Sequence, residues 1–460
     1  MRVVETELMG ALLLTDLYEL RMAASYLRHG MEGLATFSLF VRRLPPGRGF
    51  LVAAGLDDCL SFLERFAVDR HDRAYIRRIP GFTPADARAL AQLGFTGDVW
   101  AVPEGTLVFE NEPLLEVTAP IAEAQIVETY LLNQITFQTA IASKAARCRL
   151  AGRGRELVDF AFRRTHGVEA AMAVARASAI AGFAATSNVA AARRFGLTLS
   201  GTMAHSYVEA FAQEDMAFAA FVEDFPEHPT FLVDTYDTEN GVTQAIRVAQ
   251  DHGLGDAFSV RLDSGDIAVL SRRVRRLLDD AGCPGAHIFV SGGLDEDDID
   301  SLVRGGVPID AFGVGTKMGV SADAPSLDSV YKLVAYGDRP VLKLSEGKAT
   351  LPGAKQVFRN LRLGGDIVGL RAELHSDRES LLLPVMVAGQ RVGGPDTLAA
   401  MRARVDAGLA ALPERSLRLD HPEPVPVHVS DELARLRDRC TAHVQVTDTA
   451  PPRPPTTTSK

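Results

Sequence analysis

A chain of 460 residues, 47% hydrophobic and 23% charged, is long enough to bury a large core and to form two or more domains. Its formal net charge of −10 speaks against general nucleic-acid binding, which usually requires a basic face. No apolar run reaches the roughly 20 residues that cross a bilayer, and the opening MRVVET lacks the basic start and apolar stretch of a secretory signal. We therefore expect a cytoplasmic protein with no membrane or nucleic-acid partner.

The four cysteines are far apart in the sequence and form no CxxC pair. This spacing predicts neither a disulfide framework nor a cysteine zinc site, and we assign no residue as a protein metal ligand.

The first part of the chain is predicted to be β-rich. Residues 36–117 carry short β-like runs separated by Gly and Pro, as in GDVWAVPEGTLVFENEPLLEV. From residue 121 to residue 152 the apolar residues recur at helical spacing over many turns. This stretch predicts one long helix or two helices that lead into a second domain.

Beyond residue 152 a unit of apolar strand, polar loop and amphipathic helix recurs. The predicted strands lie in RELVDFAF, LTLSGTMAHS, TFLVDTYD, DAFSVRLDSGD, HIFVSGG and PIDAFGVGTKMG. Such alternation predicts parallel strands joined by right-handed crossovers, either in a β/α barrel or in a doubly wound sheet. Arg163, His205, Asp234, Arg261 and Asp263 all follow the predicted strands. Because the carboxyl ends of the strands of a barrel face one common mouth, we favour an irregular, incomplete β/α barrel.

After Tyr331 the sequence becomes β-like again and is predicted to rejoin the first domain. The overall prediction is an α/β protein in which both chain ends form a smaller β-rich domain. The predicted boundaries are 1–120 and 336–440 for that domain and 121–335 for the barrel. Residues 441–460, which end in TAPPRPPTTTSK, are predicted to be disordered because this tail cannot bury apolar surface.

Two glycine-containing loops are candidate phosphate sites. GVGT at 313–316 and SGG at 291–293 each follow a predicted strand, and their unhindered backbone N–H groups can surround a phosphate. A short GxGT is weak evidence alone, because tight strand-to-helix turns have the same composition. Two such loops in adjacent units make the phosphate interpretation stronger.

Two other strand ends combine charge with an aromatic ring. Arg261 and Asp263 in VRLDSGD are two residues apart, so their side chains point the same way. The guanidinium suits a carboxylate or phosphate and the aspartate suits a sugar hydroxyl or hydrated Mg²⁺, although a mutual salt bridge is the plain alternative. Phe160 and Arg163 in VDFAFRRTHG suit a flat anionic ring, unless Phe160 is simply a core residue.

His205 follows a Gly-Thr bend in SGTMAHS and has no second histidine three or four residues away, which speaks against zinc. A structural histidine is the ordinary interpretation. Beside two phosphate loops, however, a neutral imidazole can attack a phosphoryl group.

Eight ordered segments, from about residue 12 to 360, resemble those of the nicotinate phosphoribosyltransferase family. They include LLTDLYELRMAASY, DFAFRRTHG, SGTMAHS, FLVDTYDT, VRLDSGD and FGVGTKM. The resemblance implies that nicotinate and 5-phosphoribosyl-1-diphosphate (PRPP) are joined to give nicotinate mononucleotide and pyrophosphate, the first step of NAD salvage from nicotinate. It also implies a head-to-tail homodimer with shared active sites. ATP hydrolysis would be coupled through phosphorylation of His205, with Mg²⁺ accompanying ATP and pyrophosphate and no tightly bound organic cofactor.

The resemblance also implies residue roles. The catalytic residues are His205, Arg261 and Asp263, with the nicotinate carboxylate on Arg261. The ring stacks between Phe160 and Tyr18 of the partner subunit. The resemblance further places Arg163, Ser187 and Thr202 around the ring, and Asp234 with Asp263 at the ribose and Mg²⁺-pyrophosphate. The residues implied for the 5′-phosphate are Gly293, Gly313, Gly315 and Thr316. Those implied for the diphosphate are Arg42, Lys348 and Lys355.

Ser187 bears on substrate choice. Nicotinamide-using relatives have an aspartate at this position, which accepts from an amide N–H but repels a carboxylate, so serine predicts the acid as substrate. Ala161 and the RRTHG run depart from the family pattern and concern details of the ring pocket. Two other classes are possible: a barrel aldolase, which needs a strand lysine that no predicted strand contains, and a non-catalytic sensor of NAD precursors, for which a reacting residue should be missing.

Overall fold

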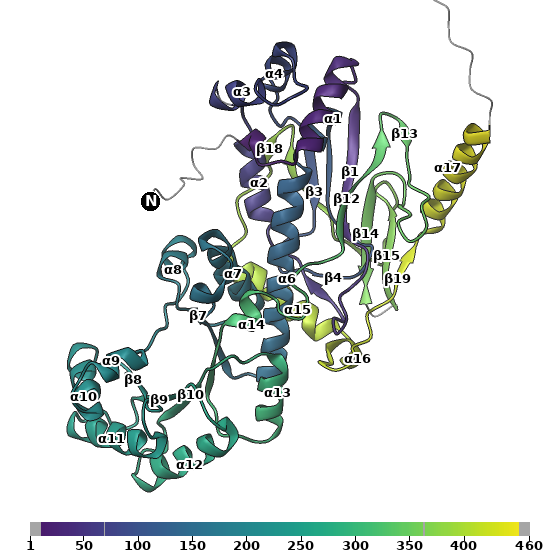
Figure 1. Cartoon of the computed structure of the whole chain (residues 1–460). Helices are drawn as coiled ribbons and strands as arrows, with labels where there is room; N and C mark the ends of the chain where they lie inside the picture. The colour runs from purple at the N-terminus through teal and green to yellow at the C-terminus, as the bar shows by residue number, and fades with distance from the viewer. Residues whose placement is uncertain (1–10, 69, 362–363, 450–460) are drawn as a thin grey trace, which may run out of the picture.

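The computed structural model describes residues 11–68, 70–361 and 364–449. Figure 1 shows two bodies, a β-rich part and a curled parallel sheet ringed by helices, with one long helix running between them. That helix is α6 (Glu128–Gly152), preceded by α5 (Ile121–Ile126), so the predicted helical stretch forms two helices. α6 contacts both bodies, because it packs against strands of the β-rich part and against helices that flank the parallel sheet.

Segments from both ends of the chain share one antiparallel sheet, as predicted. Its order is β13-β12-β1-β5-β3-β17-β18. The strands are β1 (Leu34–Val41), β3 (Asp98–Ala101), β5 (Pro113–Pro120), β12 (Ser329–Tyr336), β13 (Arg339–Pro340), β17 (Leu383–Val387) and β18 (Gln390–Arg391). β1 lies between β5 and β12, more than 200 residues apart in sequence, which is how the late strands return to the first domain.

Two smaller sheets complete the β-rich part. One pairs β2 (Leu51–Val52) with β4 (Leu107–Val108), and the other has the order β16-β14-β15-β19. The members of the second are β14 (Lys355–Asn360), β15 (Gly365–Leu370), β16 (Glu379–Ser380) and β19 (Val427–Val429). In the core of the β-rich part, the Tyr331 ring stacks on Phe37 with ring centroids 4.8 Å apart, and the Tyr331 hydroxyl donates to the Ala124 carbonyl at 2.7 Å.

Helices of this part were missed by the β-rich prediction for residues 36–117. The N-terminal region contains α1 (Leu17–Arg28), α2 (Leu56–Glu64), α3 (Arg70–Ile76) and α4 (Pro84–Leu90). α4 carries a recognisable signal, because Thr83 and Asp86 form a reciprocal capping box with a proline at the first helical position.

The parallel sheet has the order β7-β6-β11-β10-β9-β8. Its strands are β6 (Glu156–Asp159), β7 (Ala185–Thr186), β8 (Thr230–Leu232), β9 (Ser259–Leu262), β10 (His287–Val290) and β11 (Ala311–Val314). Every pairing within it is parallel, and its two end strands, β7 and β8, do not pair with each other. The prediction of an incomplete β/α barrel is thereby confirmed.

The second predicted strand needs correction. LTLS at 197–200 contributes only one bridge, between Leu199 and Thr186, while the strand at this place is β7, four residues after α7. The segment after LTLS forms two short helices where the sequence predicted one. Helices associated with the sheet are α7 (Val168–Ala181), α8 (Val189–Phe195), α9 (His205–Glu209), α10 (Glu214–Asp224), α11 (Thr238–Asp251), α12 (Ile267–Asp280), α13 (Glu296–Arg304), α14 (Thr316–Gly319) and the 3₁₀ turn η3 (Phe162–Arg164).

The C-terminal region also departs from expectation. It contains α15 (Leu398–Ala411), α16 (Glu414–Leu417) and α17 (Asp431–Thr449), and α15 packs on α7 as well as on β4. α17 makes residues 441–449 helical rather than disordered: the run 431–449 has no Gly or Pro and opens with two acids, which favours a helix. Residues 450–460 lie outside the described residues. No helix in the described ranges is both long and apolar enough to cross a bilayer.

Candidate active site

Arg261 lies at the carboxyl end of β9 and is held by three side chains. Its Nε donates to Ser291 Oγ at 2.8 Å, its Nη1 to Thr202 Oγ1 at 2.8 Å, and its Nη2 to Asp263 Oδ1 at 2.7 Å. Only 8% of the residue is exposed. The Arg261–Asp263 salt bridge considered in the sequence therefore exists, within a wider network that fixes the guanidinium at the barrel mouth.

Asp263 is joined to Asp234 on the neighbouring strand end. The Asp263 backbone N–H donates to Asp234 Oδ2 at 2.9 Å, and Ser264 Oγ donates to the same oxygen at 2.7 Å. Burial alone would raise the pKa of Asp263, but hydrogen bonds from Ser291 and Arg261, with the charges of Arg261 and His205, hold it below its ordinary value. Asp234 Oδ1 is buried without a hydrogen-bond partner among the described residues. Asp263 therefore offers an anionic carboxylate, and Asp234 offers an oxygen that has no hydrogen-bond partner among the described residues.

His205 opens α9 at the same mouth. Its Nδ1 lies 3.2 Å from Oγ1 of Thr235, the residue that follows Asp234. Its charge also influences Asp263, which places the imidazole within electrostatic range of the Arg261–Asp263 pair. The imidazole, guanidinium and carboxylate therefore share one mouth.

Sequence reasoning missed two neighbours of this group. Thr235 was not considered, although it follows Asp234 at the strand end in VDTYD. Glu214, at the start of α10, is buried, and its Oε1 has no hydrogen-bond partner among the described residues. Its pKa is raised to about 7, first by burial and then by the charges of Asp215, Asp237 and Asp234. No motif in the sequence marked it, because it depends on the packing of α10 beside β8.

Phe160 is both a core residue and a wall of the site. Its ring lies 5.6 Å from that of Phe289 and 5.3 Å from the Arg261 guanidinium carbon. Gly313 of β11 lies against this ring: a Cβ there would come within 2.7 Å of Phe160 Cδ2. The role that the structure gives Gly313 is to make room for the ring, and its predicted phosphate contact stays a prediction.

The two glycine loops lie side by side, because β10 and β11 are neighbours in the sheet. Gly292 and Gly293 both have positive φ, at 108° and 76°, and a Cβ on Gly292 would approach the Asp263 carbonyl oxygen to 2.2 Å. Gly293 faces open space. Gly315 precedes α14, which begins at Thr316. Both turns therefore expose backbone beside Asp263 and Phe160.

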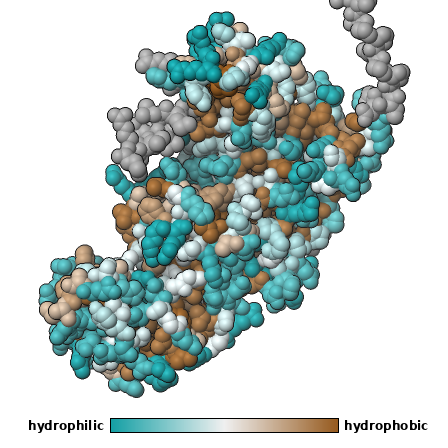
Figure 2. All heavy atoms as spheres, in the orientation of Figure 1, coloured by the Kyte–Doolittle hydropathy of each residue, from teal (hydrophilic) through white to brown (hydrophobic). Residues whose placement is uncertain are grey.

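Ser187 follows β7 and lines an open hollow of about 630 Å³ with Phe162, Val189, Ala190, Arg193 and Arg194. Arg163 is exposed on η3, next to Phe162. Figure 2 shows brown apolar patches among hydrophilic atoms over α7 and α8, where Phe162, Val168 and Val189 are exposed. This hollow is open to the surface, and neither Phe160 nor Arg261 is among the residues that line it.

Four predicted site residues lie away from this group. Tyr18 is 47% exposed on α1, and burial, then Glu128 and Glu19, raise its pKa. Arg42 follows β1, with its Nη1 3.5 Å from Asp328 Oδ1. Lys348 is exposed in the loop between β13 and β14.

Lys355 requires a correction. It is buried, its Nζ lies 3.1 Å from Glu116 Oε1, and it donates to the carbonyls of Gly353 at 2.9 Å and Leu351 at 3.4 Å. Because the ammonium is buried between a carboxylate and two carbonyls, a direct bond to a diphosphate is not supported. In the structure Lys355 stabilises the β-rich core.

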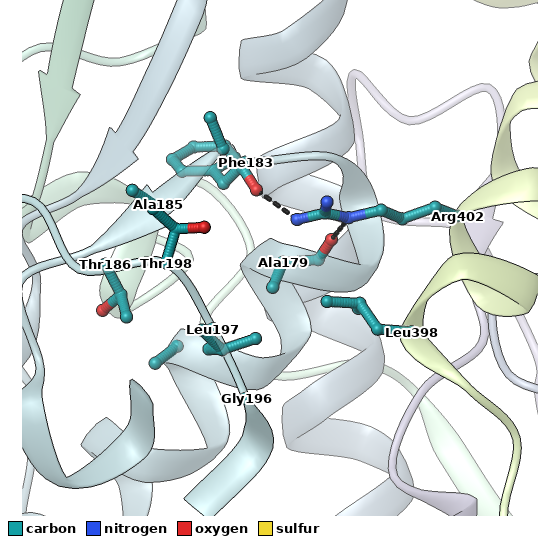
Figure 3. Close-up of a pocket in the computed structure, with 11 residues that line it drawn as sticks. Ala179, Phe183, Ala185, Thr186, Gly196, Leu197, Thr198, Leu398 and Arg402 are labelled. Carbon is teal, nitrogen blue, oxygen red and sulfur yellow. Dashed lines mark hydrogen bonds between the residues drawn. The ribbon is translucent and has the colours of Figure 1, made fainter. Parts of the chain in front are cut away.

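A cavity of about 80 Å³ lies between α7, β7 and α15 (Figure 3). Arg402 spans it, donating from Nε to the Ala179 carbonyl at 2.7 Å and from Nη2 to the Phe183 carbonyl at 2.5 Å. None of the predicted site residues lines this cavity. It is a packing gap between α15 and the barrel, apart from the candidate site.

Comparison with known proteins decides the family. Models of the nicotinate phosphoribosyltransferase (NAPRTase) family match this chain at residues 13–136 (N-terminal domain), 155–348 (the family model) and 372–437 (C-terminal domain). A nicotinate phosphoribosyltransferase of Mycobacterium tuberculosis is 49% identical over 94% of this chain and 95% of that protein. The chain belongs to the nicotinate phosphoribosyltransferase family.

Other members agree. A nicotinate phosphoribosyltransferase of Bacillus subtilis is 43% identical over 80% of this chain and 78% of that protein. The crystal structure of human nicotinic acid phosphoribosyltransferase matches with a TM-score of 0.82 at 29% identity, covering 93% of this chain and 99% of that one. The resemblance found in the sequence and the predicted fold class are both confirmed.

Proposed function

We propose that this protein transfers the phosphoribosyl group of PRPP to nicotinate, releasing pyrophosphate and forming nicotinate mononucleotide. The observation that carries the proposal is the convergence of Arg261, Asp263 and His205 at one barrel mouth, beside two exposed glycine turns. Membership in the family supports it. An aldolase receives no support, because the six strands of the parallel sheet contain no lysine.

Nicotinate fits the Phe160–Arg261 wall. A pyridine ring stacked on Phe160 would bring its carboxylate toward the guanidinium, which lies above the same aromatic ring. Arg261 already donates four hydrogen bonds, to Ser291, Thr202, Met203 and Asp263. A bidentate carboxylate would therefore displace the part-buried Thr202 contact, while Ser291 and Asp263 keep the guanidinium in place.

Asp263 and Asp234 fit the ribose and Mg²⁺-pyrophosphate. Departure of pyrophosphate builds positive charge at ribose C1, and a carboxylate kept anionic by its surroundings can stabilise that charge. Carboxylate oxygens are also preferred Mg²⁺ ligands, and Asp234 Oδ1 has no other partner among the described residues. When bound, Mg²⁺ would neutralise the leaving diphosphate.

His205 fits a phosphohistidine intermediate that couples ATP hydrolysis to the reaction. If Nδ1 donates to Thr235, Nε2 carries the lone pair. Nε2 then attacks the γ-phosphorus of ATP, the bond to the bridging oxygen breaks, and ADP leaves. The new phosphate carries about 1.5 to 2 negative charges next to Arg261 and Asp263, which can change the affinity of the site for PRPP.

The open hollow at Ser187 supports a homodimer with shared sites. Phe162 and Val189 line this hollow and are exposed, and we propose that the exposed Tyr18 of the partner subunit covers them and reaches the nicotinate ring. We further propose that the protein acts in the cytoplasm, in the first step of NAD salvage from nicotinate.

A pyrophosphate-release assay with PRPP and nicotinate, with and without ATP, tests the proposal. We expect release that requires both substrates and that ATP stimulates. No release under any condition would favour a non-catalytic binder. In His205→Ala we expect the ATP stimulation to disappear while a basal rate remains. Full stimulation in this variant would contradict the phosphohistidine step.

A further inference from the structure

The glycine turn at 291–293 is followed by an unusual concentration of negative charge. Residues 295–298 read DEDD and form the N-cap and first turn of α13. They suit the helix, because Asp295 accepts from the backbone of Asp297 and Asp298, and Asp298 accepts from the backbone of Asp295 at 3.1 Å. They are poor neighbours for a phosphate held by the preceding turn, since like charges repel at this range.

Lys317 compensates two of these carboxylates from the other glycine turn. It follows Thr316 directly, and its Nζ lies 2.9 Å from both Asp295 Oδ2 and Asp298 Oδ2. Those hydrogen bonds, first to Asp298 and then to Asp295, raise the pKa of Lys317, so the ammonium is charged throughout the neutral range.

A second, more buried set of salt bridges lies at the start of α13. Arg147 Nε is 2.8 Å from Glu296 Oε1, and Lys144 Nζ bridges Glu296 to Asp323, at 2.9 Å from the latter. Arg48 binds Asp323 at 2.8 Å from the N-terminal part of the chain. Lys317 thus joins the turn at 313–316 to the start of α13 near the surface, and Lys144 joins the start of α13 to the segment after α14 below it.

We propose that Lys317 is a positioning residue for the phosphoribosyl donor: it ties the two glycine turns together and cancels the negative charge beside them. This inference rests on the proposed function, in which these turns hold the 5′-phosphate of PRPP. Because two aspartates engage its ammonium, the role that we propose for Lys317 does not depend on a direct contact with the phosphate. It acts through the spacing of Gly293 and Thr316 and through the local charge.

The test compares Lys317→Met with Arg304→Met. Arg304 lies at the opposite end of α13, where its Nε is 2.7 Å from Asp300 Oδ2. Both variants therefore lose one positive charge, but Lys317→Met loses two ion pairs beside the glycine turns and Arg304→Met loses the pair with Asp300. We expect Lys317→Met to raise KM for PRPP about fivefold or more, from loss of roughly 1 kcal/mol of local charge compensation, with KM for nicotinate unchanged. Arg304→Met should change neither constant.

Two further measurements separate a positioning role from a general structural one. Asp298→Asn in the Lys317→Met background removes the uncompensated carboxylate and should lower KM for PRPP again, and Lys317→Arg should behave like the unsubstituted protein. Added salt should narrow the gap between Lys317→Met and the unsubstituted protein, because it screens the exposed charge. Equal effects of Lys317→Met and Arg304→Met, or no rescue by Asp298→Asn, would overturn the inference.

Calorimetry measures the affinity of the same variants for PRPP directly, without turnover. Failure of the proposed function would appear as absence of pyrophosphate release from the unsubstituted protein, whereas failure of this inference would appear as equal PRPP affinity with and without Lys317. If Lys317→Met does not fold, Asp298→Asn alone decides: tighter PRPP binding supports the charge argument, and weaker binding contradicts it.

Discussion

Arg261 combines a buried positive charge with a fixed orientation, and both depend on its planar guanidinium. A lysine could place a charge nearby but could not bind Ser291, Thr202 and Asp263 at once. We expect Arg261→Lys to lower kcat/KM for nicotinate about 100-fold, the cost of losing a buried, hydrogen-bonded charge pair. Steady-state kinetics with varied nicotinate checks this. A change of less than about threefold would show that the carboxylate binds elsewhere.

Substitutions at Ser187 test why the protein would choose nicotinate over nicotinamide. Because its side chain lines an open hollow and carries no charge, the unsubstituted protein should favour nicotinate over nicotinamide by at least about 100-fold in kcat/KM. Ser187→Asp should reduce this ratio by a similar factor, since its carboxylate repels that of nicotinate. Ser187→Ala is the control for lost hydrogen bonding. Competition assays with both substrates measure the ratio, and an unchanged ratio in Ser187→Asp would exclude the charge mechanism.

At the scale of elements, the recurring strand and helix pattern was enough to predict the parallel sheet and the gathering of Arg261, Asp263 and His205 at one end of it. The short β7 was missed because two residues carry no periodic signal, and LTLS resembles a strand although it makes one bridge. Lys355 was misplaced for a different reason. A lysine in a β-like, charged stretch gives no local sign that Glu116, 239 residues earlier, pairs with it in the core. Pairings of this kind are fixed by tertiary packing.

The β4–β5 connection and the β14–β15 hairpin meet at a buried group with excess negative charge. Arg359 Nη2 lies 2.5 Å from Asp366 Oδ2 and 3.6 Å from Glu112 Oε2, so one cation faces two carboxylates. Burial, and then the charge of Asp366, raise the pKa of Glu112 well above its ordinary value. A carboxyl whose folded pKa is raised contributes stability that is present at low pH and is lost as pH rises from the unfolded pKa through the folded one.

Glu112→Gln should therefore stabilise the protein at pH 8, by about 1 kcal/mol or more, because it removes the stability cost of the raised Glu112 pKa. The gain should shrink as the pH falls, because that cost is lost at low pH. The matched control is Glu116→Gln, which should destabilise at both pH values, since Glu116 is paired with both Lys355 and Arg371. Chemical denaturation at the two pH values measures both effects. Destabilisation by Glu112→Gln at pH 8 would contradict the charge argument.

At the scale of the whole molecule, the structure separates two residues that the reaction is proposed to bring together. Phe160 lines the barrel mouth, whereas Tyr18 lies on α1 in the β-rich body, away from the barrel in Figure 1. We propose that a second copy of the chain brings both aromatic faces to one ring, with Tyr18 of the partner subunit over the open hollow at Ser187.

Mixing two inactive variants tests this arrangement. Phe160→Ala and Tyr18→Ala should each lose most activity, because each removes one aromatic face from every site. If Tyr18 serves the partner's site, a heterodimer of the two has one site with both rings intact. Refolding an equal mixture, which yields about half heterodimers, should then restore about a quarter of the full activity. If Tyr18 served its own subunit, or not at all, no heterodimer would contain a repaired site and the mixture would be no more active than its parents.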